Sequence, residues 1–553
     1  MVSDKWYVAD FETTNYEYYL QNGYTKVWLY AICDKDANII KHGDCIEDFI
    51  SFIRTLYGKS IYFHNLKFDG TFIIDYLLSV GYEYHEDLKE VSRGFSVLIG
   101  EMGEYYSITI KFSKGKSVHI YDSLKLLPFK VEKIAKDFGL PILKGKIDYG
   151  RYVIDDESLS YIYNDVRIVA MALSQIKENG MTKMTTASCA YSQYTSMKSD
   201  DFLANAFPKL DDNILENFRL AYRGGRSQAN PLYQNKIISC VQRFDINSMY
   251  PYIMHDMELP YGLPIKITEP NTCRFEIYHI QTAFMLKSGH LPSLLKKGSL
   301  YNSDDTYYID TDGIEDLWIT NIDLELLFRN YDILFINYIE LYGFKTTKLM
   351  FYDYIDKWYA RKNIDKGAKK AVDKFMLNCL YGKFGSNHKG YHKIPILDDI
   401  TGTYKLIKSE LEDMKHYYLP IAIAVTSYAH MLIDNAIHST GLENFVYCDT
   451  DSVHTLGTLP DNMVDSHELG KFKLEGIEQK AKYVRQKCYV YKDEKGITIT
   501  CAGMPDNMKE ASIMIYGEDL FTLFGTGFKM FGKLIPKRVK GGTVLYETTF
   551  EIK

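Results

Sequence analysis

The stretch Tyr447-Cys448-Asp449-Thr450-Asp451-Ser452 places two acids between two strand-like segments. Asn444-Phe445-Val446 predicts the end of one strand, and Val453-His454-Thr455-Leu456 the start of another. Asp449 and Asp451 are therefore expected at a tight hairpin with both side chains on one face. Two carboxylates this close repel each other unless cations neutralise them, and hard oxygen ligands suit Mg²⁺. An isolated D-x-D is more often a simple turn, so the interpretation depends on the rest of the chain.

Length and composition restrict the protein class. At 553 residues, 46% hydrophobic and 25% charged, the chain matches an ordinary soluble protein of several domains, at about 150 residues each. The sequence opens without a signal-peptide pattern and lacks the run of about 18 apolar residues that spans a bilayer. Its nine cysteines are scattered without a C-x-x-C pair. We therefore expect free thiols in a reducing cytoplasm, with neither secretion nor membrane insertion.

Charge is distributed unevenly along the chain. The net charge of −7 by itself argues against a nucleic-acid-binding protein. Lysines and arginines nevertheless gather at 361–389, 480–487 and 529–540. A solvated face usually explains one such cluster. Three in an acidic protein predict a positive channel against a negative exterior.

Three acidic motifs lie in the first 165 residues. Asp10 and Glu12 share one face of a predicted strand that begins at Trp6, and Asp69 precedes a helix predicted at 71–78. Asp165 follows Tyr161 by four residues in a segment with helical spacing, so the two share a face. Singly, each acid is more often a cap or a surface charge. Together they resemble the D-x-E, N-x-x-x-D and Y-x-x-x-D pattern of proofreading 3′–5′ exonucleases.

The chemistry of phosphodiester hydrolysis agrees with this pattern. It requires an activated water and stabilisation of the leaving oxygen, which two metal ions about 4 Å apart achieve when carboxylates hold them. Asp10, Glu12, Asp69 and Asp165 are predicted metal ligands or their supports, and Tyr161 is predicted to position the water. Lys144 is implied by the resemblance to stabilise the phosphate. The residues implied to hold a frayed 3′ end are Thr13, His64, Asn65, Phe68, Phe72, Ser123 and Leu124. Phe68 and Phe72 have the alternative of being core residues rather than stacking platforms.

Two motifs follow a helical region at 170–220, in which a domain boundary is expected near 185–190. Tyr222-Arg223-Gly224-Gly225-Arg226 combines glycines, which let a backbone approach a ligand, with two arginines suited to phosphate; a simple turn is the alternative. In Arg243-Phe244-Asp245-Ile246-Asn247-Ser248-Met249-Tyr250-Pro251, a strand is expected to reach Asp245, followed by a turn and a short helix stopped by Pro251. Asp245 is the predicted third carboxylate beside Asp449 and Asp451. Tyr250 is predicted to stack beneath a sugar and exclude a 2′-hydroxyl, unless these residues are a helix cap and a core tyrosine.

Residues 350–386 are expected to form the longest helical stretch. Lys370, Lys374, Asn378 and Tyr381 are spaced by four, four and three, so they line one face. A cationic and aromatic stripe suits an incoming triphosphate and base. A solvated amphipathic face would explain the lysines but not Asn378 and Tyr381. Further on, Lys487-Cys488-Tyr489 is predicted to lie in a strand, with its two outer residues on one face.

The ordered motifs Y-R-G-G, D-I-N-S-M-Y-P, K-F-M-L-N-C-L-Y-G, Y-C-D-T-D-S and K-C-Y resemble a family B DNA polymerase. Compact length, Y-R-G-G and the ending C-A-G-M…V-K-G-G-T-V-L-Y-E-T-T-F-E-I-K narrow the resemblance to the protein-primed polymerases of small Bacillus phages with linear genomes. It covers nearly the whole chain. The least similar segment is 387–418.

The resemblance implies an α/β (α+β) multidomain fold, with an RNase H-like exonuclease domain followed by a right-hand polymerase with two insertions. The implied ranges are exonuclease 1–186, palm 187–256 and 420–500, fingers 350–386, thumb 501–553, and insertions 257–349 and 387–419. The second insertion is expected to be a β-hairpin, too small for a core of its own.

The implied reaction is nucleotidyl transfer with two Mg²⁺ per active site, for which Mn²⁺ substitutes. Asp245 and Asp451 would hold the ions, with Asp449 in support and Ile246 as a further contact. Lys370 and Lys374, with Lys362 as an additional candidate, would bind phosphates. Asn378 and Tyr381 would form the base-pair pocket, Tyr250 the sugar gate, and Lys487 and Tyr489 the primer-terminus contact. Tyr222, Arg223, Gly224 and Gly225 would contact DNA.

The implied partners are template and primer DNA, dNTPs and a terminal protein whose hydroxyl side chain serves as primer. A single-stranded DNA-binding protein is a further candidate, and the enzyme is expected to act as a monomer in the cytoplasm of an infected bacterial host. Two other classes stay open: a conventionally primed family B repair or plasmid polymerase, and a nucleic-acid-binding scaffold that has lost catalysis. Intact carboxylates at both sites argue against the scaffold.

Overall fold

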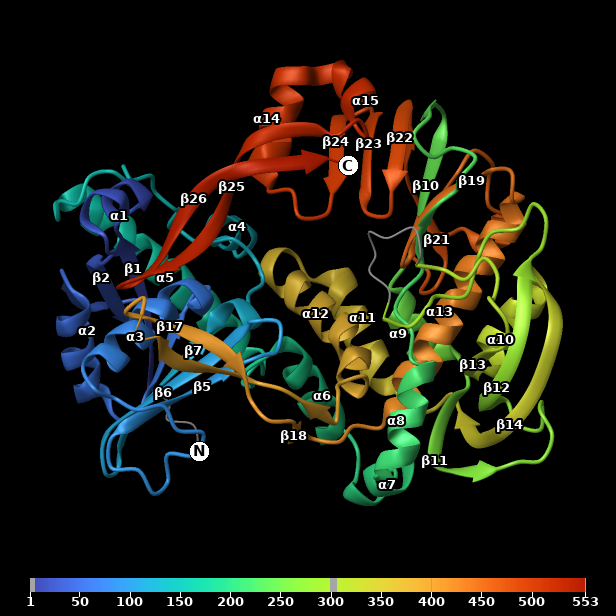
Figure 1. The fold of residues 1–553 in the computed structure, drawn as a ribbon, viewed down its shortest axis with the longest axis horizontal. Coiled ribbons are helices and arrows are strands. Elements are labelled where there is room, and N and C mark those ends of the chain that lie inside the picture. The colour runs from blue at the N-terminus through green and yellow to red at the C-terminus, as the bar shows by residue number, and fades with distance from the viewer. Residues whose placement is uncertain (1–4, 299–305, 399, 553) are drawn as a thin grey trace.

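A seven-stranded sheet forms the N-terminal part of the chain, drawn in blue in Figure 1. The structure is a computed structural model that describes residues 5–298, 306–398 and 400–552. The strand order is β3-β2-β1-β4-β7-β6-β5, with β1 antiparallel to β2 and parallel to β4. The strands are β1 (Trp6–Thr13), β2 (Val27–Asp34), β3 (Ile39–Gly43), β4 (Ser60–Phe63), β5 (Gly94–Ile99), β6 (Tyr105–Ser113) and β7 (Lys116–Asp122). The strand predicted from Trp6 onward therefore lies in the interior of a sheet.

Five helices accompany this sheet in the described chain: α1 (Tyr16–Asn22), α2 (Ile46–Ile53), α3 (Leu66–Ser79), α4 (Val131–Asp137) and α5 (Asp156–Glu178). Helix α5 packs on β1 and β2. It starts with a capping box, in which the Asp155 side chain accepts from the Ser158 N–H and the Ser158 hydroxyl accepts from the Asp155 N–H. Helix α3 begins at Leu66 rather than at Thr71 as predicted, because Asn65 takes a left-handed conformation (φ 76°) that turns the chain directly from strand to helix.

The predicted palm is a five-stranded sheet of order β21-β10-β20-β19-β8. Its strands are β8 (Ser227–Ala229), β10 (Val241–Ile246), β19 (Phe445–Asp449), β20 (Ser452–Thr455) and β21 (Phe472–Glu478). Both Asp245 and Asp449 pair with Ser452, from opposite sides of β20. The sheet thus brings together motifs about 200 residues apart, as predicted.

Two helices pack beside the palm sheet. The buried α13 (Leu419–Thr440) contacts α9 (Met249–Asp256). The short helix predicted after Asp245 is α9. The prediction that Pro251 stops it is wrong, since α9 continues to Asp256. Pro251 lies in the first turn, where backbone N–H groups have no partner within the helix, so its missing N–H costs little.

The region 170–220 is helical as predicted, with α6 (Thr186–Ser196), α7 (Asp200–Ala206) and α8 (Asp212–Ala221) following α5. The predicted fingers are two helices, α11 (Tyr352–Ile364) and α12 (Gly367–Phe384), packed against each other. The prediction of the longest helical stretch at 350–386 is wrong. Asp365 and Lys366 have extended backbones that interrupt the run, and α12 starts at Gly367 with φ 57°. Both α5 with 23 residues and α13 with 22 are longer than either helix.

In its described residues, the first predicted insertion is a four-stranded sheet of order β11-β14-β12-β13 with one helix. Its elements are β11 (Leu259–Lys266), β12 (Phe275–Leu286), β13 (Glu315–Thr320), α10 (Asn321–Asn330) and β14 (Tyr331–Thr347). Helix α10 packs against α13. The insertion is therefore joined to the helix behind the palm sheet.

The second predicted insertion contains the expected hairpin, β16 (Lys393–Asp398) with β17 (Thr403–Lys408). The short strands β15 (Lys389–Gly390) and β18 (Glu412–Asp413) pair at its base. Tyr404 of this arm is 1% exposed and belongs to the core of the N-terminal domain, where its hydroxyl lies 3.2 Å from that of Tyr105. The described residues of the hairpin form no core of their own, and Tyr404 shares that of the N-terminal domain.

The C-terminal part begins with a sheet of order β24-β23-β22-β9 and ends in a long hairpin. Its elements are β22 (Lys480–Arg485), β23 (Cys488–Asp493), β24 (Gly496–Cys501), α14 (Asp506–Tyr516), α15 (Leu520–Leu523), β25 (Phe528–Val539) and β26 (Gly542–Ile552). The strand β9 (Ile237–Ile238) comes from much earlier in the chain and joins the sheet by pairing with β22. The red β25–β26 hairpin reaches the N-terminal domain (Figure 1), where the Gly541 N–H donates to Asp75 Oδ2 at 2.9 Å and the Thr25 N–H to the Lys540 carbonyl at 2.9 Å. The predicted thumb therefore closes against the predicted exonuclease.

The structure bears on the expectations about disulfides and membrane spans. All nine cysteines are free, so the chain has no disulfide framework. Within the described ranges, no helix has the length and apolarity needed to cross a membrane. The residue boundaries of the predicted domains remain predictions.

Candidate active sites

The four N-terminal acids come from three elements. Asp10 and Glu12 lie on β1, Asp69 in the first turn of α3 and Asp165 on α5. A cavity of about 120 Å³ is lined by Asp10, Lys144 and Asp165 among others. Strand and helix packing thus assembles the predicted cluster.

The acids of this cluster influence one another strongly. Burial and the nearby Asp165 carboxylate raise the pKa of Asp10 to about 7. Burial and the Asp10 carboxylate raise the pKa values of Glu12 and Asp69 well above the usual range. The positive groups near this site therefore do not balance the negative charge of its four carboxylates.

Lys144 supplies part of the compensation. Its Nζ lies 2.5 Å from Asp165 Oδ2, whereas the buried Asp165 Oδ1 has no hydrogen-bond partner among the described residues. The Tyr161 hydroxyl lies 3.1 Å from that of Tyr149, and Lys144 Nζ lies 5.0 Å from the Tyr161 ring. Tyr149 was not predicted, because it belongs to an irregular segment without a motif.

The residues implied to hold a DNA end divide into two groups. Thr13, Asn65, Phe68 and Leu124 are at least partly exposed. Phe72 and Ser123 are 1% and 0% exposed, so neither side chain is open to solvent in this structure, and their implied contact with a DNA end stays a prediction. Their burial follows from packing, Phe72 in the domain core and Ser123 with its hydroxyl donating to the Phe63 carbonyl. His64 is also occupied internally, by the Ser123 hydroxyl at 3.0 Å and the Phe129 carbonyl at 2.7 Å.

The second cluster joins Asp245 at the end of β10 to Asp451 in the turn after β19. The Ile246 N–H donates to the Asp451 carbonyl at 2.8 Å, which fixes the two segments together. Burial and the Asp451 carboxylate raise the pKa of Asp245 to about 7, and burial followed by Asp449 raises that of Asp451. The Ile246 side chain is 1% exposed, so only its backbone could contact a metal.

Asp449 faces a lysine. Lys487 Nζ lies 2.6 and 2.7 Å from its two carboxylate oxygens. The prediction that Lys487 lies in a strand is wrong: it occupies the turn between β22 and β23 with φ 53°, and only Cys488 and Tyr489 belong to β23. Tyr489 is part of an aromatic cluster, with its ring centroid 5.0 Å from that of Tyr447 and 5.1 Å from that of Tyr483.

The predicted nucleotide face of α12 is open to solvent. Lys370, Lys374 and Asn378 are exposed, and Tyr381 is half-buried. The Tyr381 ring lies 4.0 Å, centroid to centroid, from that of Tyr250. Lys362 Nζ donates to the Ser248 hydroxyl at 2.8 Å, and burial with the neighbouring Lys374 and Lys370 lowers its pKa.

The Tyr222–Arg226 motif lies against the acidic turn, but its arginines are buried. A Cβ on Gly225 would lie 3.0 Å from Thr450 Oγ1, so the glycine allows a close approach. Arg223 donates to the Leu295 and Trp318 carbonyls, each at 3.1 Å, and Arg226 pairs with Asp434 at 2.7 Å. The prediction that these two guanidinium groups serve phosphate is therefore wrong, because sequence pattern does not report burial. The Tyr222 hydroxyl packs against Gly385, where an added Cβ would lie 2.6 Å from it.

The basic cluster at 480–487 is also largely engaged within the protein. Lys480 pairs with Glu518 at 2.7 Å, and Lys482 is 7% exposed. This cluster does not provide the free basic surface that its composition predicted. The predicted positive channel therefore depends on the basic clusters at 361–389 and 529–540.

Neither acid cluster is a preformed three-ligand metal site. Across residues 5–298, 306–398 and 400–552, no three His, Cys, Asp or Glu side chains are arranged to hold one ion. Lys487 and Lys144 occupy oxygens of Asp449 and Asp165. Binding of Mg²⁺ at either cluster stays a prediction.

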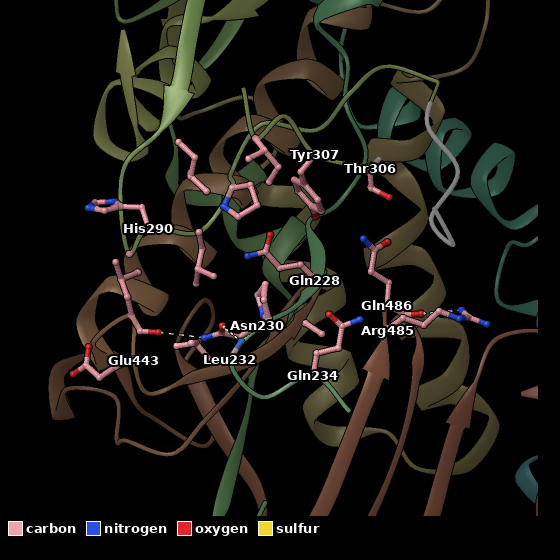
Figure 2. Close-up of a pocket in the computed structure, with 18 of the residues that line it drawn as sticks. Gln228, Asn230, Leu232, Gln234, His290, Thr306, Tyr307, Glu443, Arg485 and Gln486 are labelled. Carbon is pink, nitrogen blue, oxygen red and sulfur yellow. Dashed lines mark hydrogen bonds between the residues drawn. The ribbon is translucent and has the colours of Figure 1, made fainter. Parts of the chain in front are cut away.

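A larger cavity, of about 700 Å³, separates the palm from the first insertion (Figure 2). Gln228 and Gln234 line it from the palm side, and His290 and Tyr307 from the insertion. None of the predicted site residues lines it.

Comparison with known proteins adds independent information. The family "DNA polymerase type B, organellar and viral" matches residues 51–152 and 150–468. The chain is 36% identical to the DNA polymerase of Bacillus phage phi29, with 99% of each chain covered. It is 33% identical to that of Streptococcus phage Cp-1, over 99% of this chain and 98% of the relative. The solved structure of phi29 DNA polymerase with primer-template DNA and incoming nucleotides superposes with a TM-score of 0.90 at 34% identity, covering 99% of this chain and all of the other.

Proposed function

The chain belongs to the type B DNA polymerases of organelles and viruses. We propose that it replicates a linear viral genome and starts synthesis from a protein primer. We also propose that it removes mismatched nucleotides at a second, exonuclease site. The observation that carries the polymerase site is the pairing of Asp245 and Asp449 on either side of Ser452, with Asp451 in the adjoining turn. Burial and the Asp451 carboxylate raise the pKa of Asp245, so the site has room for further positive charge. The exposed lysines of α12 lie nearby, since Lys374 lowers the same pKa.

The donor set at this site fits Mg²⁺, with Mn²⁺ as a substitute. Mg²⁺ prefers oxygen ligands and is commonly bound by one or two carboxylates together with substrate phosphates, so Asp245 and Asp451 suffice. When bound, the ions neutralise the triphosphate and lower the pKa of the primer hydroxyl. Asp449 supports the site through its ion pair with Lys487.

The remaining residues position the substrates. Lys370 and Lys374 attract the triphosphate, since both project to solvent from the face that carries Asn378. The Tyr250 and Tyr381 rings contact each other, tilted by 31°, and form the floor on which sugar and base rest. Catalysis is then mostly orientation and electrostatics, as in phosphoryl transfer generally.

The N-terminal cluster is proposed as the 3′–5′ exonuclease site. Its oxygen donors also fit Mg²⁺, because the buried Asp165 Oδ1 has no hydrogen-bond partner in the described part of the chain and the pKa of Asp10 is raised by burial and like charge. Lys144 balances charge on the scissile phosphate. Tyr161, held by Tyr149, orients the attacking water.

Protein priming and strand displacement rest on similarity to phage polymerases that this chain matches along its whole length. The proposed partners are template DNA, dNTPs, a terminal protein that donates a hydroxyl, and a single-stranded DNA-binding protein. The enzyme is proposed to act as a monomer in the cytoplasm of an infected bacterium.

The two sites are tested by separating their activities. Asp451→Ala is expected to abolish Mg²⁺-dependent primer extension, because no neighbour replaces the lost carboxylate, while excision of single-stranded DNA continues. Asp10→Ala and Asp165→Ala should do the reverse. Extension by Asp451→Ala at near the parent rate, or loss of both activities in a folded variant, contradicts the assignment.

Priming is tested with the purified cognate terminal protein and one labelled dNTP at a time. Covalent transfer of label to the terminal protein supports protein priming. No transfer, alongside efficient extension of an ordinary DNA primer, favours the conventionally primed alternative.

A further inference from the structure

The backbone of Gly224–Arg226 supports the turn that carries Asp449 and Asp451. The Thr450 N–H donates to the Arg226 carbonyl at 2.7 Å. On one side Gly225 packs against the Thr450 side chain, and on the other Ser227 pairs with Asp449 in the sheet. A displacement of this segment therefore moves the backbone between the two acids.

The side chain of Arg226 anchors the segment in the interior. It is 1% exposed; Nη1 lies 2.7 Å from Asp434 Oδ1 on α13, and Nη2 donates to the Pro292 carbonyl at 3.1 Å. Because a guanidinium stays charged in proteins, a buried one needs such a partner. Arg226 is thus held to the helix behind the sheet and to the first insertion at once.

Asp434 in turn holds three further groups. Arg329 Nη1 lies 3.1 Å from its Oδ2, the Asn330 amide donates to its Oδ1 at 3.2 Å, and His438 Nδ1 lies 3.3 Å from its Oδ2. Arg329 and Asn330 belong to α10 of the insertion. A single buried carboxylate therefore connects the insertion, α13 and the segment under the acidic turn.

The neighbouring residue Gly224 is held in the same way. Its carbonyl accepts from His430 Nε2 at 2.6 Å, and His430 Nδ1 lies 2.8 Å from Asp323 Oδ1 on α10. The segment is consequently fixed at both ends by buried polar groups that bridge α13 and α10.

We propose that Arg226 and Asp434 are positioning residues for polymerisation, which hold the Asp449–Thr450–Asp451 turn in register with Asp245 and link its placement to the docking of the first insertion. The inference rests on the proposed role of those acids. Neither residue reaches the reacting atoms, so both act through the Arg226 carbonyl and the Gly225 contact.

A purely structural ion pair would have a different signature. Its loss would lower thermal stability and change all activities of the surviving protein together. A positioning role instead lowers the rate at saturating nucleotide, since a 1 Å misplacement of reacting groups can cost about 100-fold. Nucleotide KM and the exonuclease, which is assembled in another domain, should change little.

The decisive variants are Arg226→Met, which removes the charge at similar length, and Arg226→Lys, which keeps the charge for Asp434. Leu327→Ala is the stability control, because Leu327 is a buried α10 residue in a separate apolar cluster of the insertion. Single-nucleotide incorporation, dNTP KM, excision of single-stranded DNA and melting temperature are measured on each preparation, with Asp451→Ala alongside.

The expected result for Arg226→Met is a fall of about 10- to 100-fold in saturated incorporation, with KM and excision within about 3-fold of the parent. Arg226→Lys should recover most of the rate, and Leu327→Ala should keep it despite a lower melting temperature. The inference is overturned by a parent-like rate in folded Arg226→Met, or by an equal loss in Leu327→Ala. Robust extension by Asp451→Ala would instead refute the underlying assignment of the acids.

Discussion

Lys487 Nζ lies within 2.7 Å of both carboxylate oxygens of Asp449. This pair divides the three acids of the polymerase site by role. Asp449 forms an ion pair within the protein. Burial and the Asp451 carboxylate raise the pKa of Asp245, and burial and Asp449 raise the pKa of Asp451, so these two acids are the ones proposed to hold metal and substrate. The lysine also comes from the turn that precedes Tyr489, so the proposed primer-terminus contact and the acidic turn are in direct contact.

Removing the charge of Lys487 should weaken extension. Lys487→Met leaves Asp449 repelling Asp451, and a charge-assisted hydrogen bond is lost, so extension is expected to fall about 10-fold. Lys487→Arg, which keeps the charge, should retain more activity. Steady-state extension and excision are compared on the same preparations. Equal extension by Lys487→Met and the parent would mean that the pair has no part in synthesis.

The contacting rings of Tyr250 and Tyr381 should control the choice of sugar. Tyr250→Val removes the ring that lies 4.0 Å from Tyr381, which opens space at the 2′ position. Discrimination between dCTP and CTP, measured as the ratio of kcat/KM values, should fall at least about 10-fold. Tyr250→Phe is the matched control and should discriminate as the parent does. Unchanged discrimination in Tyr250→Val would assign the gate to another residue.

Glu478 should make stability depend on pH. Burial raises the pKa of its carboxyl to about 7, against the lowering effects of Tyr483 and Arg243. Between its ordinary value of 4.5 and about 7, the unfolded chain releases this proton while the folded protein retains it. The stability of the parent therefore falls as pH rises through this window, by about 3 kcal/mol for this group alone.

Glu478→Gln removes that titration. The difference in melting temperature, variant minus parent, should become more positive from pH 5 to pH 8. Altered contacts to Arg243 and Tyr483 can shift this difference at pH 5, but they do not change its trend with pH. Glu475→Gln is the control, since Glu475 is exposed on the same strand, and its difference from the parent should stay constant with pH. A constant difference for Glu478→Gln as well would exclude Glu478 as the source.

Sequence reasoning located residues whose role follows from a short pattern. Asp10 with Glu12, Tyr161 with Asp165, and the face of α12 all rest on spacings of two to four residues, which the backbone converts directly into shared faces. It failed where a partner is distant in sequence. Lys487 with Asp449, Arg226 with Asp434 and Tyr404 with Tyr105 are separated by 38, 208 and 299 residues. For the same reason Arg223 and Arg226 were assigned to phosphate, since an arginine beside glycines looks alike in sequence whether it is exposed or buried.

The arm at 387–419 connects the polymerase to the N-terminal domain. Tyr404 is buried in the core of that domain, and its ring lies 4.3 Å from the guanidinium carbon of Arg538 in the thumb hairpin. Arm, thumb and N-terminal domain thus meet at Tyr404, and we expect this junction to close around DNA. Such closure is expected to prevent dissociation and to admit one template strand at a time.

Replacing 391–416 with a short Gly/Ser linker should therefore leave gap filling on an open template nearly intact. Product length per binding event and synthesis through duplex DNA should both fall sharply, because the Tyr404 contact is lost. Tyr404→Ala should reproduce part of this defect without a deletion, whereas Tyr404→Phe, which loses only the hydroxyl, should not. Processivity is measured with a trap for free enzyme, and displacement on a primed circle with a long duplex. Unchanged displacement by the deletion would show that the arm is dispensable, and would direct the search to the basic residues of the thumb at 529–540.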